Sequence, residues 1–162
     1  QLWDPSQYVP HASMPMLFIN GTNDFAYHAE TWNKTAGLAL EGYQLLNVGM
    51  EHSQQQGASS LEIAAFLEQV FQDDQKFNVI EKIQFEKGLL TARYHLKPKI
   101  KEAYLVYTAS DSSNIGRSWH KIQVNLNQNN LKVRVPDDAK LFYLIATSNY
   151  NLKLSSQLFE NK

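Results

Sequence analysis

The sequence predicts an α/β segment followed by an all-β segment, and two observations support this division. Over residues 1–72, apolar runs of strand length alternate with segments whose apolar residues recur at helical spacing. After the polar joint Gln72-Asp73-Asp74-Gln75, apolar residues recur at every second position, which is the spacing of half-buried strands. We therefore expect one unit over residues 1–74 and a second over residues 75–162.

The first unit is predicted to begin with a strand, a helix and a second strand. Leu17-Phe18-Ile19 is an apolar run that ends at Asn20-Gly21, and a second run extends from Tyr43 to Val48. Between them, from about His28 to Leu40, apolar residues fall on one helical face, and Gly42 ends the segment. This order favours two parallel strands joined by a right-handed crossover.

A further helix is predicted after the second strand. Ser59-Ser-Leu-Glu62 has the spacing of a capping box, in which a Ser and an acidic residue satisfy the first free amides of a helix. Five apolar residues then share one helical face. These are Ile63, Phe66, Leu67, Val70 and Phe71.

The second unit is predicted to be a small antiparallel β-sandwich. About seven short apolar runs are separated by clusters of Ser, Asn, Asp, Gly and Pro. This pattern is typical of immunoglobulin-like or fibronectin-like sandwiches. The runs Ala103 to Tyr107 and Leu141 to Ala146 are apolar at consecutive positions, so we expect them to form the central strands.

Two parallel strands alone leave a sheet incomplete. Such a pair cannot cover both of its faces and exposes unpaired backbone groups along its edges. We therefore expect a partner for this chain. It is either a missing N-terminal portion of a larger protein or a second copy of the chain.

Composition excludes several function classes. Of the 162 residues, 43% are hydrophobic and 19% are charged, which is typical of a globular domain. No apolar run approaches the roughly 20 residues that span a bilayer, so we expect no membrane partner. Fifteen basic and sixteen acidic residues give a net charge of -1, which disfavours nucleic acid as a partner. The chain has no Cys, and no motif predicts a cofactor.

Asp24 and His52 are the candidate catalytic residues. Asp24 follows the first predicted strand in the turn Asn20-Gly-Thr-Asn-Asp24, and His52 follows the second strand in Gly49-Met-Glu-His52. Each stands just past the carboxyl end of a predicted parallel strand, where α/β proteins place their ligand sites. An acid and an imidazole placed side by side can activate a hydroxyl. Taken alone, Asp24 is also explained as a polar turn residue that caps the next helix, and His52 as an exposed loop residue.

The nucleophile of such a site is missing. A Ser-His-Asp site needs a Ser on a tight turn of the form Gly-x-Ser-x-Gly. Gly57-Ala-Ser59 and Gly116-Arg-Ser118 begin this pattern, but the second Gly is absent from both. His11 and His28 lie near the same loops, yet they lack a metal-ligand spacing, so we expect no metal site.

The chain resembles the C-terminal part of bacterial α/β hydrolases of the acetylxylan-esterase-like and PhoPQ-activated pathogenicity-related type. Three segments carry the resemblance, namely Trp3-Asp-Pro-Ser6, the segment from Pro15 to Tyr27, and Met50-Glu-His52 with Gly57. The resemblance implies a partial α/β-hydrolase unit followed by a sandwich, a periplasmic or secreted location, and a carbohydrate ester as a candidate substrate. It also implies that Asp24 is the triad acid and His52 the triad base.

We therefore expect the C-terminal fragment of a serine-hydrolase-like protein that acts on carbohydrate or other acyl esters and is inactive alone. Two alternatives remain. In one, the sandwich is a non-enzymatic module that binds glycan or protein, with aromatic residues such as Tyr104, Tyr107 and Trp119 as a stacking face. In the other, the chain is a self-associating scaffold that pairs through its exposed strand edges.

Overall fold

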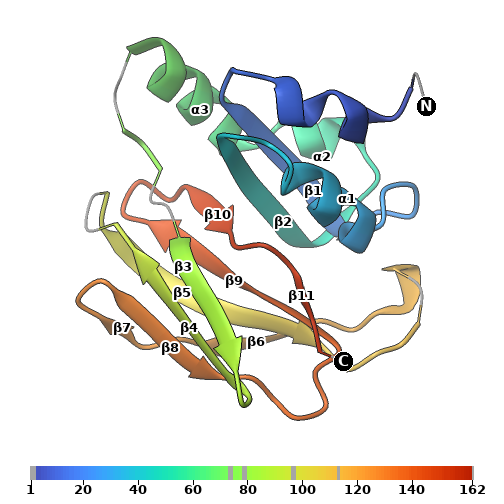
Figure 1. Ribbon diagram of the computed structural model, residues 1–162, viewed down its shortest axis with the longest axis vertical. Coiled ribbons are helices and arrows are strands. Elements are labelled where there is room, and N and C mark those ends of the chain that lie inside the picture. The colour runs from blue at the N-terminus through green and yellow to red at the C-terminus, as the bar shows by residue number, and fades with distance from the viewer. Residues whose placement is uncertain (1–2, 73–74, 78–79, 96–97, 113, 162) are drawn as a thin grey trace.

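Strands dominate the architecture. In the computed structural model, strands account for 42% of the chain and helices for 22%. The structure describes residues 3–72, 75–77, 80–95, 98–112 and 114–161 (Figure 1). The strands are β1 (Met16–Asn23), β2 (Gly42–Glu51), β3 (Ile80–Glu86), β4 (Leu89–Tyr94), β5 (Ile100–Thr108), β6 (His120–Gln123), β7 (Leu126–Asn127), β8 (Asn130–Arg134), β9 (Leu141–Ser148), β10 (Lys153–Ser155) and β11 (Phe159–Glu160).

The helices are few and short. Three are α-helices, namely α1 (Ala29–Ala36), α2 (Gln54–Ala58) and α3 (Leu61–Gln72). Three are single 3₁₀ turns, namely η1 (Pro5–Gln7), η2 (Val9–His11) and η3 (Asn114–Gly116). The predicted helix over about 28–40 is therefore shorter than expected, because the chain leaves the helix at Gly37 rather than at Gly42.

The prediction of an α/β segment with a partial α/β-hydrolase core is wrong. Within the described residues, parallel pairing is confined to β1 and β2, and the other two sheets are antiparallel. Strands β1 and β2 and the helix between them do form, but no further parallel strand in the described part of the chain pairs with either strand. The overall fold is mostly β, which agrees with the prediction for the C-terminal part.

The C-terminal part is a pair of antiparallel sheets packed face to face. One sheet has the order β10-β9-β5-β6, with β11 also paired to β9, and the other has the order β3-β4-β8-β7. A cluster of buried residues fills the space between them, including Leu90, Leu105, Leu131 and Phe142. As predicted, β5 and β9 are inner strands, and all of β9 is buried. The joint at residues 72–75 includes positions 73 and 74, which lie outside the described residues.

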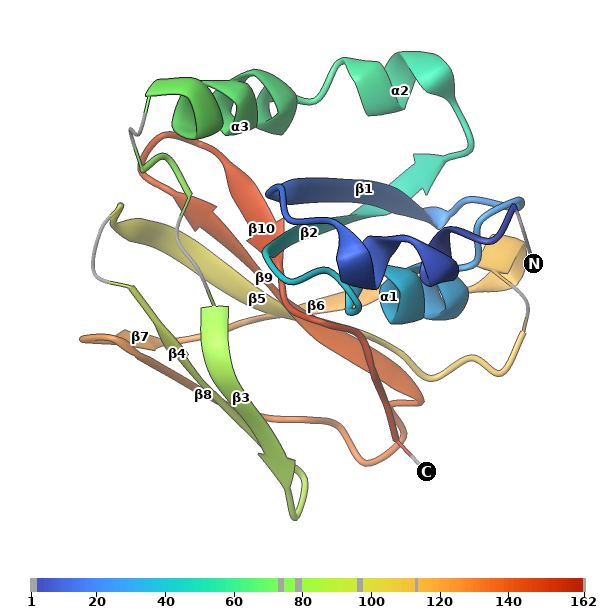
Figure 2. The same ribbon diagram turned by 45° about the horizontal axis from the view of Figure 1, so that its top comes forward.

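The parallel pair is covered by the sandwich (Figure 2). Leu45 and Leu46 of β2 pack with Val106, Tyr143 and Ile145 in one buried cluster that both halves of the chain share. This shared cluster buries the Leu45 and Leu46 side chains without a further parallel strand. The division into units 1–74 and 75–162 stays a prediction.

Side chains of the sandwich also satisfy the outer edge of β2. The Leu46 amide donates to Ser155 Oγ at 3.0 Å, and Ser155 Oγ donates to the Gln44 carbonyl at 3.2 Å. The Tyr143 hydroxyl donates to the Leu46 carbonyl at 2.9 Å. These hydrogen bonds replace those of a neighbouring strand, because a buried strand edge has to satisfy its backbone groups.

Helix α3 is oriented differently from the prediction. Its buried residues are Glu62 and Ala65, whereas Leu67, Val70 and Phe71 are exposed. Polar contacts set this orientation. Glu62 Oε1 accepts the Lys153 amide at 2.8 Å, and Gln69 Oε1 accepts amides of the segment after the helix.

Candidate active site

Asp24 and His52 meet at the carboxyl edge of the parallel pair. Asp24 follows the last residue of β1, and His52 follows the last residue of β2. Because the strands are parallel and their last residues Asn23 and Glu51 pair, both ends arrive at the same edge of the sheet. Asp24 Oδ2 lies 3.1 Å from His52 Nδ1, which is hydrogen-bond distance.

Asp24 is buried, with 5% of its surface exposed, and it uses both carboxylate oxygens. Oδ1 accepts the backbone amides of Ala26 and Tyr27, each at 2.8 Å, while Oδ2 faces His52. The alternative of a helix cap is not observed, because the residue that precedes α1 is His28 and its side chain makes no capping hydrogen bond. Asp24 instead closes the loop before that helix and holds the imidazole.

The ionised form of Asp24 is favoured. Burial acts to raise the pKa of its carboxyl, but the hydrogen bonds from the Tyr27 amide, His52 and the Ala26 amide outweigh burial and lower the pKa below its ordinary value. A carboxylate at this position fixes the orientation of the imidazole, because it accepts a hydrogen bond from an N–H at Nδ1.

His52 contacts two aromatic rings. The Phe25 ring meets it edge-on at a centroid distance of 5.1 Å, and the Tyr27 ring lies tilted at 5.5 Å. Both rings belong to the loop that Asp24 closes. The His52 side chain remains 42% exposed, and among the described residues no hydrogen bond engages Nε2. The imidazole is therefore held at Nδ1 by Asp24, while Nε2 is open to an incoming group.

The backbone around the pair is closely fitted. A Cβ at Gly21 would lie 1.9 Å from the carbonyl oxygen of Met50, so only Gly allows the two strand ends to come this close. Buried Thr22 accepts the amide of Gly49 through Oγ1 at 2.9 Å, and Gly49 has a φ of 79°. The Asn20 side chain donates to the Tyr27 carbonyl at 2.9 Å. These contacts fix the loops that carry the acid and the imidazole.

A loop of the sandwich approaches the same end of β1. η3 contacts β1, and Arg117, one residue after η3, donates to Glu30 of α1 at 2.5 Å. Burial acts to raise the pKa of Glu30, but the guanidinium of Arg117 outweighs it and the pKa is lowered. This ion pair ties the sandwich to the helix that follows the Asp24 loop.

Among the described residues, none of the other sequence candidates forms a hydrogen bond with the imidazole. Ser59 Oγ donates to the Gln56 carbonyl, and Ser53 Oγ accepts the Gln56 amide at the start of α2. In the part of the chain that the structure describes, no group of three or more His, Asp or Glu side chains is placed to hold a metal ion, and His11, His28 and His52 form none. The described residues place no serine hydroxyl in hydrogen-bond contact with His52.

Sequence reasoning missed the residues that support the pair. Asn20 and Thr22 are polar and follow a buried strand, which is a signal for buried, hydrogen-bonded side chains. Phe25 and Tyr27 carry no such signal. Their contact with His52 depends on the loop geometry, which involves residues 28 positions apart.

Comparison of the chain with family models, with curated proteins and with solved structures finds no match. Over the described residues, no helix has both the length and the apolar character needed to cross a membrane.

Proposed function

We propose that this chain supplies the acid and the general base of a Ser-His-Asp type hydrolase. The nucleophilic hydroxyl comes from a segment outside this chain or from a partner. The observation that carries this proposal is the hydrogen bond between Asp24 Oδ2 and His52 Nδ1, together with the open position at Nε2. The substrate class we propose is an acyl ester, in particular a carbohydrate ester. That choice rests on the resemblance of the segments around Asp24 and His52.

The chemistry follows from the tautomer that Asp24 favours. With the proton on Nδ1, the lone pair of Nε2 accepts the proton of an incoming hydroxyl as its oxygen attacks the ester carbonyl. His52 then returns this proton to the departing alkoxide, and the acyl group stays on the hydroxyl oxygen. A water molecule, deprotonated by His52 in the same way, then attacks this acyl ester, releases the acid and restores the hydroxyl. Asp24 stays ionised and stabilises the imidazolium whenever it forms.

The surroundings of His52 support this role. Phe25 and Tyr27 restrict the ring to one orientation, and general base catalysis depends on such positioning. Their own surfaces are 61% and 63% exposed, so they form an apolar rim beside the imidazole. An acyl group can contact this rim while its carbonyl faces the hydroxyl.

The test is hydrolysis of an activated ester by a protein that contains this chain together with its nucleophile. His52→Ala is expected to lower kcat by about six orders of magnitude, because the members of a triad act as a unit. His28→Ala is the matched control. It removes an exposed imidazole from the same loop region, and its side chain makes no capping hydrogen bond, so kcat should stay near that of the unchanged protein.

The 162-residue chain alone is expected to show no turnover that depends on His52. Ester hydrolysis by the isolated chain that His52→Ala abolishes would contradict the proposal, because it would mean that the nucleophile lies within the chain. Equal loss of activity in the His28 and His52 variants of the longer protein would also contradict it.

A further inference from the structure

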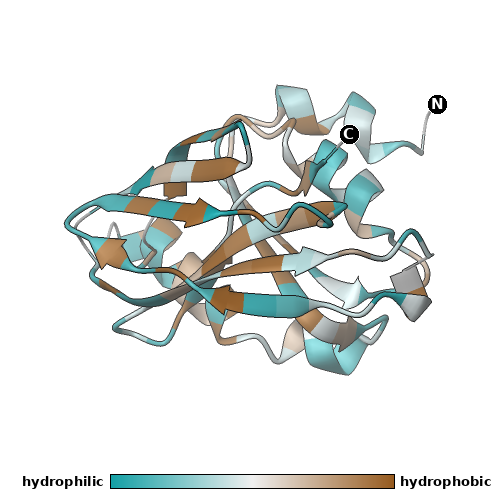
Figure 3. Ribbon diagram, turned by 90° about the horizontal axis from the view of Figure 1, so that it is seen from below, coloured by the Kyte–Doolittle hydropathy of each residue, from teal (hydrophilic) through white to brown (hydrophobic). Residues whose placement is uncertain are grey.

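The outer face of the β3-β4-β8-β7 sheet carries a hollow lined by polar side chains. Strands of this sheet alternate hydrophobic and hydrophilic residues, which place one set in the core and the other outside (Figure 3). The hollow has a volume of about 470 Å³. We call it the basic groove and define it by its outward residues Lys82, Gln84, Thr91, Arg93, Asn130 and Lys132.

The basic groove concentrates positive charge. Three of its six outward residues are cations, none is an acid, and all three cations are exposed. Within the described residues, none of these cations forms an ion pair. Glu81, which lies opposite Arg93 in the strand register, pairs with His95 instead. The groove therefore presents three cations that are not held in ion pairs within the described residues.

Strand pairing sets the arrangement of the hydrogen-bonding groups. Thr91 stands opposite Gln84 on one side and Lys132 on the other, and Arg93 stands opposite Asn130. Each such row crosses neighbouring strands about 4.8 Å apart, and successive outward rows lie about 7 Å apart along the strands. Each of the two rows thus places one cation of the groove, Lys132 or Arg93, beside a hydroxyl or amide group on the neighbouring strand.

Strand β3 contains a bulge at the basic groove. The register between β3 and β4 shifts between Glu81 and Gln84, and Lys82 within this bulge has a φ of 51°. The left-handed region is uncommon for a residue other than Gly, and bulges redirect side chains at functional edges of sheets. Here the strained residue is one of the three cations of the groove.

A second hollow continues the first. It has a volume of about 370 Å³, shares Gln84 and Thr91 with the basic groove, and is also lined by Lys87 and Arg134. Glu86 is its one acidic lining residue. Together the two hollows form an elongated surface that suits a linear ligand rather than a compact one.

We propose that the basic groove binds a linear polysaccharide that carries carboxylate groups, as in a chain of uronic acids. Lys and Arg side chains recognise carboxylates, and the interleaved amides and hydroxyl suit the hydroxyl groups of the sugar ring. The groove has no aromatic lining residue, so it lacks the ring stacking that single-stranded nucleic acids use.

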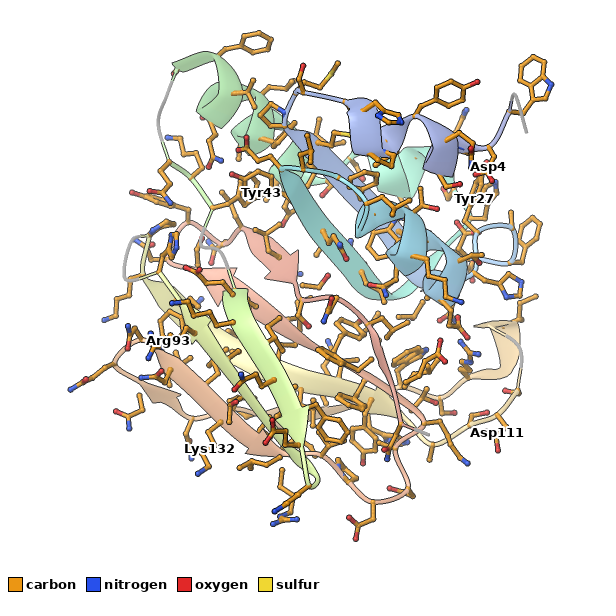
Figure 4. The ribbon with its side chains drawn as sticks, viewed as in Figure 1. Asp4, Tyr27, Tyr43, Arg93, Asp111 and Lys132 are labelled. Carbon is orange, nitrogen blue, oxygen red and sulfur yellow. The ribbon has the colours of Figure 1, made fainter. Side chains whose placement is uncertain are left out.

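This site is separate from the proposed hydrolase pair. Figure 4 shows Arg93 and Lys132 on the sheet at the lower left, whereas Tyr27, which contacts His52, lies at the upper right. The proposal does not depend on the Asp24–His52 pair, so each can fail while the other holds.

The test is titration of the whole chain with polygalacturonate at low salt, with neutral dextran as the uncharged counterpart. We expect binding to polygalacturonate, none to dextran, and weaker binding as salt is added, because exposed charges are screened. The double variant Arg93→Gln with Lys132→Gln is expected to weaken binding about tenfold, since two exposed charge contacts are lost.

The matched control removes two exposed cations elsewhere, by Lys34→Gln with Lys101→Gln. It should bind within about twofold of the unchanged chain, as expected for charges far from the ligand. Unfolding midpoints of both double variants establish that they fold. If the Arg93 and Lys132 pair does not fold, Lys132→Gln alone replaces it, with an expected loss of about threefold.

Three results would overturn the proposal. The first is an absence of binding to polygalacturonate by the unchanged chain. The second is an equal loss of binding in both double variants. This result would mean that exposed cations anywhere on the protein attract the polysaccharide, rather than those of the basic groove. The third is tighter binding to a single-stranded oligonucleotide than to polygalacturonate, which would assign the surface to nucleic acid.

Discussion

At the scale of single residues, Asp24 has two functions, because it closes its own loop and orients His52. Because the pKa of Asp24 is lowered in the folded state, the contribution of this carboxyl to fold stability should decrease as the pH falls. A carboxyl whose pKa is lower in the folded state stabilises the fold above its unfolded pKa, near 3.8, and this stabilisation is lost as the pH falls through the folded value.

Asp24→Asn is therefore expected to lower the free energy of unfolding at neutral pH by about 1–3 kcal/mol, the cost of weakening a buried hydrogen-bonded group. Denaturant unfolding from about pH 7 down to about pH 3 measures this difference. It should shrink on the acid side, because the wild-type carboxyl becomes protonated there. A difference that is constant over the whole range would show that the charge of Asp24 does not contribute.

At the scale of elements, the site depends on how closely the ends of β1 and β2 approach. Gly21→Ala places a methyl group against the Met50 carbonyl and is expected to cost about 2–4 kcal/mol of stability, because two paired strands have to separate. It should also weaken the Asp24–His52 contact, which those strands position.

Gly57→Ala is the control for this change. A Cβ at Gly57 meets only the end of the Met50 side chain, at 3.9 Å, and the residue lies within α2. This substitution is expected to be neutral or to stabilise by up to about 1 kcal/mol, because Ala favours the helix more than Gly does. Thermal unfolding of both variants makes the comparison. Equal stability of the two would refute the close approach of the strands.

The sequence predicts where helices and strands form better than it predicts which of their faces the rest of the chain covers. Asp24 and His52 could be paired from the sequence, because parallel strands end at one edge and both residues follow apolar runs. The orientation of α3 could not, since Glu62 turns inward to meet Lys153, which lies 91 positions later. Apolar spacing shows that a helix has an apolar face, but it does not show which face the rest of the chain covers.

At the scale of the whole molecule, the parallel pair and the sandwich share one core. The same long-range packing explains why the predicted α/β core is absent. Ser155 and Tyr143 occupy the edge of β2 where a further parallel strand would bind. Their positions lie 109 and 97 residues from Leu46, so local patterns in the sequence do not reveal this contact.

Tyr143→Phe tests this shared core. Burial raises the pKa of the Tyr143 hydroxyl, which therefore stays protonated and donates to the Leu46 carbonyl. The substitution leaves that buried carbonyl without this donor, and it is expected to cost about 1–3 kcal/mol. Unfolding should remain a single transition, seen equally by probes in both halves. Two separate transitions in the unchanged chain would show that the halves fold independently.

The most direct test of the central claim is ¹⁵N NMR of the His52 ring, which reports which nitrogen carries the proton. Our account predicts that the neutral imidazole is protonated at Nδ1 and bare at Nε2, and that Asp24→Ala removes this preference. A wild-type ring protonated at Nε2, or a tautomer unchanged by Asp24→Ala, would contradict the claim that Asp24 prepares His52 to accept a proton from a hydroxyl.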